Sequence, residues 1–76
     1  MYIFIAIVIF TYEGGLTGSF EIEDPVPFWS YDECLRSGPN ALKRIDAKFQ
    51  SGRIHMPENS FGFPQVKTFC KLYNIG

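Results

Sequence analysis

The first twelve residues constrain the fold most, because they are almost all apolar and are rich in β-branched and aromatic side chains. Such a composition favours a β-strand over a helix. Side chains alternate between the two faces of a strand, so the apolar residues divide into two rows. One row contains Tyr2, Phe4, Ala6, Val8, Phe10 and Tyr12, and the other contains Ile3, Ile5, Ile7, Ile9 and Thr11. Both faces of this strand therefore have to be covered.

The chain is too short to provide that cover easily. Its 76 residues make one small domain, spanning residues 1–76, and a domain of this size buries only about 60% of its extended-state surface. With 46% hydrophobic and 20% charged residues, the composition is that of a globular protein. We therefore expect a protein partner, which is either a second copy that forms a homodimer or a different protein.

Two further segments of the chain have strand character. A glycine-rich turn over 13–18 leads into an alternating segment over 19–23, in which Phe20 and Ile22 point inward and Glu21 and Glu23 point to solvent. Acidic side chains suit an edge strand. Because proline cannot donate to the ladder, residues 24–27 are expected to end this strand. Another strand is expected over 66–73, after a long ordered loop over 50–64.

The middle of the chain predicts helix. Ser30 and Glu33 match a capping box, and apolar residues then recur at steps of three and four as far as Phe49. The sequence Gly38-Pro39 interrupts this stripe without changing its phase. It predicts either one bent helix over 30–50 or two short helices on one face, with Pro39 beginning the second.

These elements predict a small α+β domain with the order β-β-α-β. Its antiparallel sheet has three strands in the order 2-1-3, and one bent helix packs on one face. The other face would stay open unless aromatic residues from the connections fold beneath it. The aromatic residues that could do so are Phe28, Trp29, Phe61 and Phe63.

The charges are unevenly distributed along the chain. Residues 1–35 contain six acidic residues and no lysine or arginine, whereas residues 36–76 contain all seven basic residues and two acidic ones. If the fold keeps the two halves apart, the molecule is electrically bipolar, which favours a charged partner or head-to-tail contact. The alternative is pairing within the fold. A net charge of −1 argues against a nucleic-acid partner.

The apolar start does not predict export or membrane insertion. A signal peptide needs a basic start and a small-residue cleavage site, and a spanning helix needs about 20 apolar residues. The apolar run has neither the flanks nor the length. We expect no signal peptide, no transmembrane helix and no membrane partner.

The two cysteines leave three possibilities. Cys34, on the inward stripe of the helix, and Cys70, on the last strand, could form a disulfide, or both could be buried thiols. A thiol/disulfide redox role is the third. His55 is the only histidine, and the paired cysteine spacing of a closed zinc site is missing. We therefore expect no catalytic residues, no metal and no cofactor.

A candidate binding surface combines exposed basic residues with aromatic residues from the loops, since aromatic and arginine side chains dominate interface hot spots. Its members are Trp29, Tyr31, Arg36, Lys43, Arg44, Arg53, His55, Phe61 and Phe63.

The overall pattern resembles small bacteriophage-encoded proteins. The resemblance rests on the apolar first strand, on the helix that opens with Ser30-Tyr31-Asp32-Glu33-Cys34, and on the last strand with Lys67-Thr68-Phe69-Cys70. The Gly38-Pro39 break departs from it. The resemblance implies an accessory protein of the host cytoplasm that inhibits a host factor by surface contact. The predicted function is thus non-enzymatic protein binding, and the alternatives are a virion or assembly component and a redox protein that uses its two cysteines.

Overall fold

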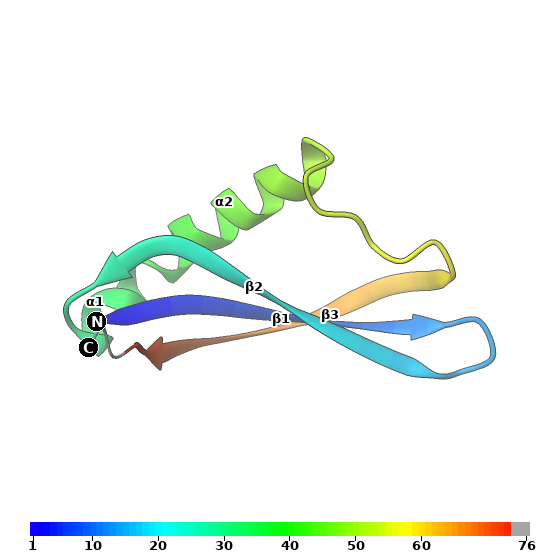
Figure 1. Cartoon of the computed structure of the whole chain (residues 1–76), viewed down its shortest axis with the longest axis horizontal. Helices are drawn as coiled ribbons and strands as arrows, with labels where there is room; N and C mark the ends of the chain where they lie inside the picture. Colours follow the sequence, from blue (N-terminus) through cyan, green and yellow to red (C-terminus); the bar gives the residue numbers. More distant parts are fainter. Residues whose placement is uncertain (74–76) are drawn as a thin grey trace.

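The computed structural model describes residues 1–73 and has three strands and two helices in the order β-β-α-α-β (Figure 1). The strands are β1 (Tyr2–Tyr12), β2 (Thr17–Phe28) and β3 (Ser60–Leu72). The helices are α1 (Tyr31–Arg36) and α2 (Gly38–Gln50). Across the part of the chain described, none of the helices has the length and apolar character needed to cross a membrane.

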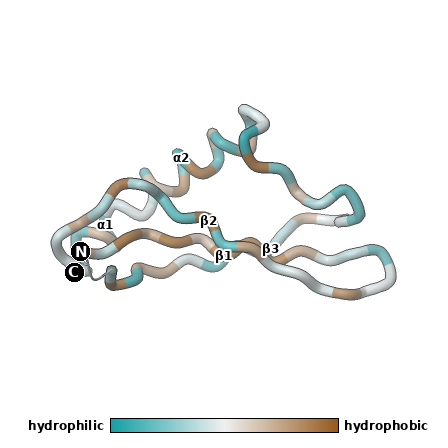
Figure 2. The backbone as a smooth tube through the Cα atoms, viewed as in Figure 1, coloured by the Kyte–Doolittle hydropathy of each residue, from teal (hydrophilic) through white to brown (hydrophobic). Residues whose placement is uncertain are grey.

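The strands form one antiparallel sheet in the order β2-β1-β3, which confirms the predicted α+β fold and strand order. The apolar β1 is the central strand and pairs with a neighbour on each side (Figure 2). A tight turn at Gly14 and Gly15, both with positive φ, joins β1 to β2. Glycine reaches this conformation without steric cost.

Both helices pack on the same face of the sheet, which we call the helix side. The buried side chains there form one cluster, and they come from β1, β2 and both helices. Its members are Phe4, Ala6, Val8, Ile22, Cys34, Ala41 and Ile45. The row of β1 that begins with Tyr2 therefore supplies the core, and neither α1 nor α2 covers the opposite face (Figure 1).

The helical segment is divided into two helices, so the second of the two sequence-based alternatives is right and a single bent helix is wrong. The Ser30 side chain caps α1 by accepting a hydrogen bond from the Glu33 backbone N–H at 3.1 Å, as the capping box predicts. Proline lies in the first turn of α2, where its missing N–H costs nothing. Gly38 is buried beside Phe4, whose ring would lie 3.1 Å from an added Cβ.

The second strand is longer than predicted. It continues through Pro25 and Pro27 to Phe28, with a register shift opposite Ile3 to Ile5. The prediction that residues 24–27 end the strand is wrong, because β2 is an edge strand. The outer side of an edge strand, and a bulge within it, both tolerate a residue that cannot donate a hydrogen bond.

The third strand begins at Ser60 rather than at residue 66, so the connection after α2 is shorter than expected. Ile54 and Met56 of this connection pack against the helix-side cluster. Trp29, Phe61 and Phe63 are strongly exposed, at 80%, 57% and 102% of full accessibility. These aromatic residues therefore do not seal the opposite face of the sheet.

Candidate functional site: an open sheet face

The candidate site is the sheet face turned away from the helices, which we call the open face. Its central row is Ile3, Ile5, Ile7 and Ile9 of β1. The strand register places Ser19, Glu21 and Glu23 of β2 along one side of this row. It places Gln65, Lys67, Phe69 and Lys71 of β3 along the other side. The open face is therefore an apolar stripe between an acidic border and a basic border.

Most of the isoleucine row is only partly covered. Ile3, Ile7 and Ile9 are half-buried, although their side chains are as apolar as those of the core. Ile5 is fully buried but is not part of the helix-side cluster. Together with Phe69, which is 37% exposed opposite Ile5, these residues form an apolar surface that the described residues do not enclose.

One side chain partly covers the open face at one end. The backbone N–H of Tyr73 donates a hydrogen bond to the Met1 carbonyl oxygen at 2.7 Å. Its hydroxyl donates to Glu23 Oε1, also at 2.7 Å. Tyr73 lies on the β3 side of β1, whereas Glu23 lies on the β2 side, so the tyrosine side chain spans β1 at the end of the strand that includes Ile3 and Ile5. Ile7 and Ile9 lie further along β1, towards its other end.

The hydrogen bond to Glu23 is the main reason that the pKa of Tyr73 is raised above its usual value; partial burial and the charges of Glu23 and Glu21 contribute in the same direction. The Lys71 ammonium lies 5.8 Å from the ring centroid, and the Met1 amino group donates to the Tyr73 carbonyl. A raised tyrosine pKa favours the neutral form in the folded state. Its contribution to stability is therefore complete below about pH 10 and is lost as the pH rises through the folded-state pKa.

We expect Glu23→Gln to lower the pKa of Tyr73, because the substitution removes the charge that makes ionisation unfavourable. The measurement is tyrosinate absorbance during alkaline titration, with Tyr73→Phe identifying the signal of this residue. Ser19→Ala, on the same border of β2, is the control and should leave the titration unchanged. An unchanged curve for Glu23→Gln would show that the hydroxyl does not bond to this carboxylate.

The central charged residues of the two borders are Glu21 and Lys67. Both lie opposite Ile7, one on each side of β1, so they occupy the same transverse row of the sheet. Neither takes part in a side-chain hydrogen bond or ion pair among residues 1–73. In contrast, Glu23 accepts a hydrogen bond from Tyr73. Glu21 and Lys67 are therefore free to bind charges of the opposite sign on the open face.

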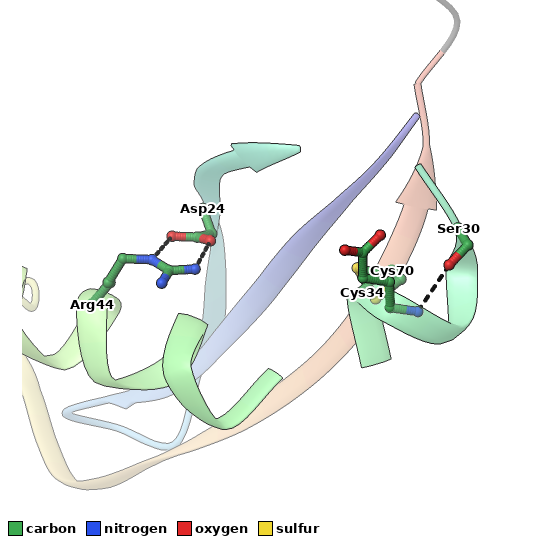
Figure 3. The surroundings of a disulfide bond; sticks show 6 residues. Asp24, Ser30, Cys34, Arg44 and Cys70 are labelled. Atoms are coloured by element: carbon green, nitrogen blue, oxygen red, sulfur yellow. Dashed lines mark hydrogen bonds and ion pairs between the residues drawn. A yellow bond between two sulfur atoms is a disulfide. The ribbon is translucent and has the colours of Figure 1, made fainter. Parts of the chain in front are cut away.

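The structure resolves the question about the cysteines. Cys34 of α1 and Cys70 of β3 form a disulfide, with their Cα atoms 6.3 Å apart (Figure 3). Cys34 is fully buried in the helix-side cluster, and Cys70 is half-buried. A catalytic disulfide needs a sulfur atom that an incoming thiolate can reach. The buried position of Cys34 is typical of a structural disulfide and does not favour the redox alternative.

Arg44 has a structural partner that the sequence does not reveal. Its Nε and Nη2 atoms donate to the two carboxylate oxygens of Asp24 at 2.9 and 2.6 Å (Figure 3). Asp24 is completely buried, and the hydrogen bond to it raises the pKa of the Arg44 guanidinium. A buried carboxylate needs such a charge-assisted pair. This pair ties α2 to β2, so Arg44 is not a free cation for a partner.

The helix side of the sheet also has a groove. It is an open apolar groove of about 530 Å³ between α2, β1 and β3. Its polar members are Asp46 and Thr68, while Leu42, Ile45 and Phe49 supply the helix wall. Asp46 already accepts a hydrogen bond from Gln50. The groove therefore offers an apolar site with little to orient a polar ligand.

The nine predicted binding residues do not form one surface. Trp29, Tyr31 and Arg36 belong to α1 or the segment before it, whereas Phe61 and Phe63 lie at the start of β3, at the other end of the molecule (Figure 1). Arg36 pairs with Asp32 on the surface at 2.9 Å, and Tyr31 packs edge-on against Tyr2. The remaining members occupy α2 and the connection after it; they are Lys43, Arg44, Arg53 and His55.

Sequence reasoning identified the open face but left its residues out of the candidate set. Only Phe61 of that set extends it, opposite Thr11 at the end of β1. The alternation in β1, together with the acidic alternation over 19–23, was the signal that could have selected Ile7 and Glu21. Comparison with protein-family models, with curated proteins and with solved structures gives no match for this chain.

Proposed function

We propose that this chain is a non-enzymatic protein-binding module that binds through its open face. The supporting observation is the partly exposed isoleucine row on the central strand, which neither helix of residues 1–73 covers. Burying one isoleucine side chain is worth about 1.5–3 kcal/mol, and soluble monomers rarely expose large contiguous apolar patches. Because Ile7, Ile9 and Phe69 are already partly buried, a protein surface that covers them would gain part of this energy for each side chain.

The disulfide bears on where the module acts. Disulfides persist in oxidising environments and are rare in the reducing cytoplasm. The Cys34–Cys70 bond therefore favours an oxidising compartment over the host cytoplasm.

The narrower function suggested by the resemblance, a phage-encoded inhibitor of a host factor, stays a prediction. A virion or assembly component is the second candidate, and it is favoured by the same open face, since stacked sheets are a common way to build an assembly.

We expect the double substitution Ile7→Lys/Ile9→Lys to abolish complex formation without unfolding the chain, because both side chains are partly exposed on the open face and neither belongs to the helix-side cluster. A lysine there adds charge to an apolar interface, which should weaken binding by about 100-fold or more. The measurement is recovery of stoichiometric complexes from extracts of the cells that express the gene. A differently tagged second copy is included, so that self-association is detected as well.

The matched control is Leu42→Lys, which introduces the same side chain at an exposed position of α2. Circular dichroism should show native structure in the unmodified protein, in the double variant and in Leu42→Lys. Complexes that survive the double substitution, or no complex with any protein, would contradict the proposed function.

A further inference from the structure

We infer that the partner of the open face is a second copy of this chain, stacked face to face about a two-fold axis that runs parallel to the strands. This inference rests on the proposed function and names the occupant of the binding surface. It follows from the arrangement of charge on the two borders of the isoleucine row.

The borders carry opposite charges, which are matched across β1 in one transverse row. Glu21 and Lys67 flank Ile7 in one transverse row, with the glutamate on β2 and the lysine on β3. Along the same face, Glu23 continues the acidic border in the row of Ile5, where Phe69 lies on the other side, and Lys71 continues the basic border one row further, opposite Ile3. A surface with this left-right asymmetry is complementary to its own copy, provided that the copy is turned so that the two borders exchange places.

Only one orientation of the two-fold axis achieves this exchange. When two sheets stack face to face, an axis parallel to the strands places β2 of one copy over β3 of the other. An axis that lies across the strands places β2 over β2 and brings like charges together. The first arrangement puts Glu21 opposite the partner's Lys67 at the same level, and the symmetry repeats the pair on the other border. The isoleucine rows then pack against each other in the centre, at about 10 Å between sheets.

The size of the face sets the expected strength. Three strands about 4.8 Å apart, with some eight residues rising about 3.4 Å each, make a face of roughly 14 by 27 Å. Two such faces bury on the order of 800 Å² together, which is small for a specific interface. We therefore expect a reversible dimer that dissociates in the micromolar range and is governed by Glu21, Lys67 and the isoleucine row.

The test is a charge exchange followed by sedimentation. Glu21→Lys and Lys67→Glu should each weaken self-association by about tenfold or more, because each creates two like-charge contacts per dimer. Mixed in equal amounts, the two variants should form a heterodimer with the affinity of the unmodified protein, since both borders then carry opposite charges again. Glu58→Lys and Lys43→Glu, at exposed positions away from the open face, are the controls with the same changes in charge.

Rescue in the mixture, with neither control variant weakened, is the result that the inference predicts. The inference is overturned if Glu21→Lys associates as tightly as the unmodified protein does. Dimerisation through the free edge of β3 would give that result. It is also overturned if the mixture is no tighter than the single variants, or if the unmodified protein stays monomeric. If the unmodified protein is monomeric and Ile7→Lys/Ile9→Lys abolishes its binding to a different protein, the dimer is excluded but the proposed function stands. If the monomer binds no protein at all, both the dimer and the proposed function are excluded.

Discussion

Reduction of the Cys34–Cys70 disulfide is expected to lower the free energy of unfolding by about 4 kcal/mol, the value for a bond between residues 36 apart in the chain-entropy account. For a domain of this size, that loss corresponds to a decrease in Tm of roughly 15–30 °C. The bond has this effect because it restricts the unfolded chain. It also attaches α1 to the sheet, and a helix of six residues has little stability of its own.

The measurement is thermal unfolding followed by circular dichroism, with and without reductant. The double variant Cys34→Ala/Cys70→Ala is the matched control: it should melt at the low temperature in both conditions. A decrease of less than about 5 °C in the unmodified protein would mean that the bond adds little to the fold.

The local signals in the sequence predicted the fold well. The β-branched run identified the central strand, and the alternation of Phe20 and Ile22 with Glu21 and Glu23 assigned the faces of β2 correctly. The capping box placed the start of α1 at Ser30. In each case the physical cause lies within a few residues of its effect, so one stretch of sequence contains all the information that is needed.

The features that were missed depend on partners far away in the chain. Asp24 followed by two prolines resembles a strand end, but its carboxylate is buried because Arg44, 20 residues later, pairs with it. The same holds for Tyr73, whose hydroxyl reaches Glu23 across 50 residues. Neither pairing leaves a local pattern, and both become visible only when the sheet register brings the elements together.

The strand β1 also allows the two sheet faces to be compared at neighbouring positions. Val8 faces the helix side and is 1% exposed, whereas Ile7 lies on the open face and is half-buried. Val8→Thr replaces one methyl group by a hydroxyl, and Ile7→Thr does the same relative to Ile7→Val, because threonine also lacks the terminal methyl of isoleucine. Counted from these references, the two substitutions differ mainly in the face that receives the hydroxyl. A hydroxyl buried on the helix side lacks water and should cost about 2 kcal/mol, whereas one on the open face stays hydrated.

The most direct test of the open face is therefore equilibrium unfolding by denaturant of these two variants and of Ile7→Val, at protein concentrations below the expected dimer dissociation constant. We expect Val8→Thr to lose about 2 kcal/mol relative to the unmodified protein, and Ile7→Thr to lose less than about half of that relative to Ile7→Val. Equal losses would show that Ile7 belongs to a closed core in the isolated chain, and no surface would then be left for a partner to cover.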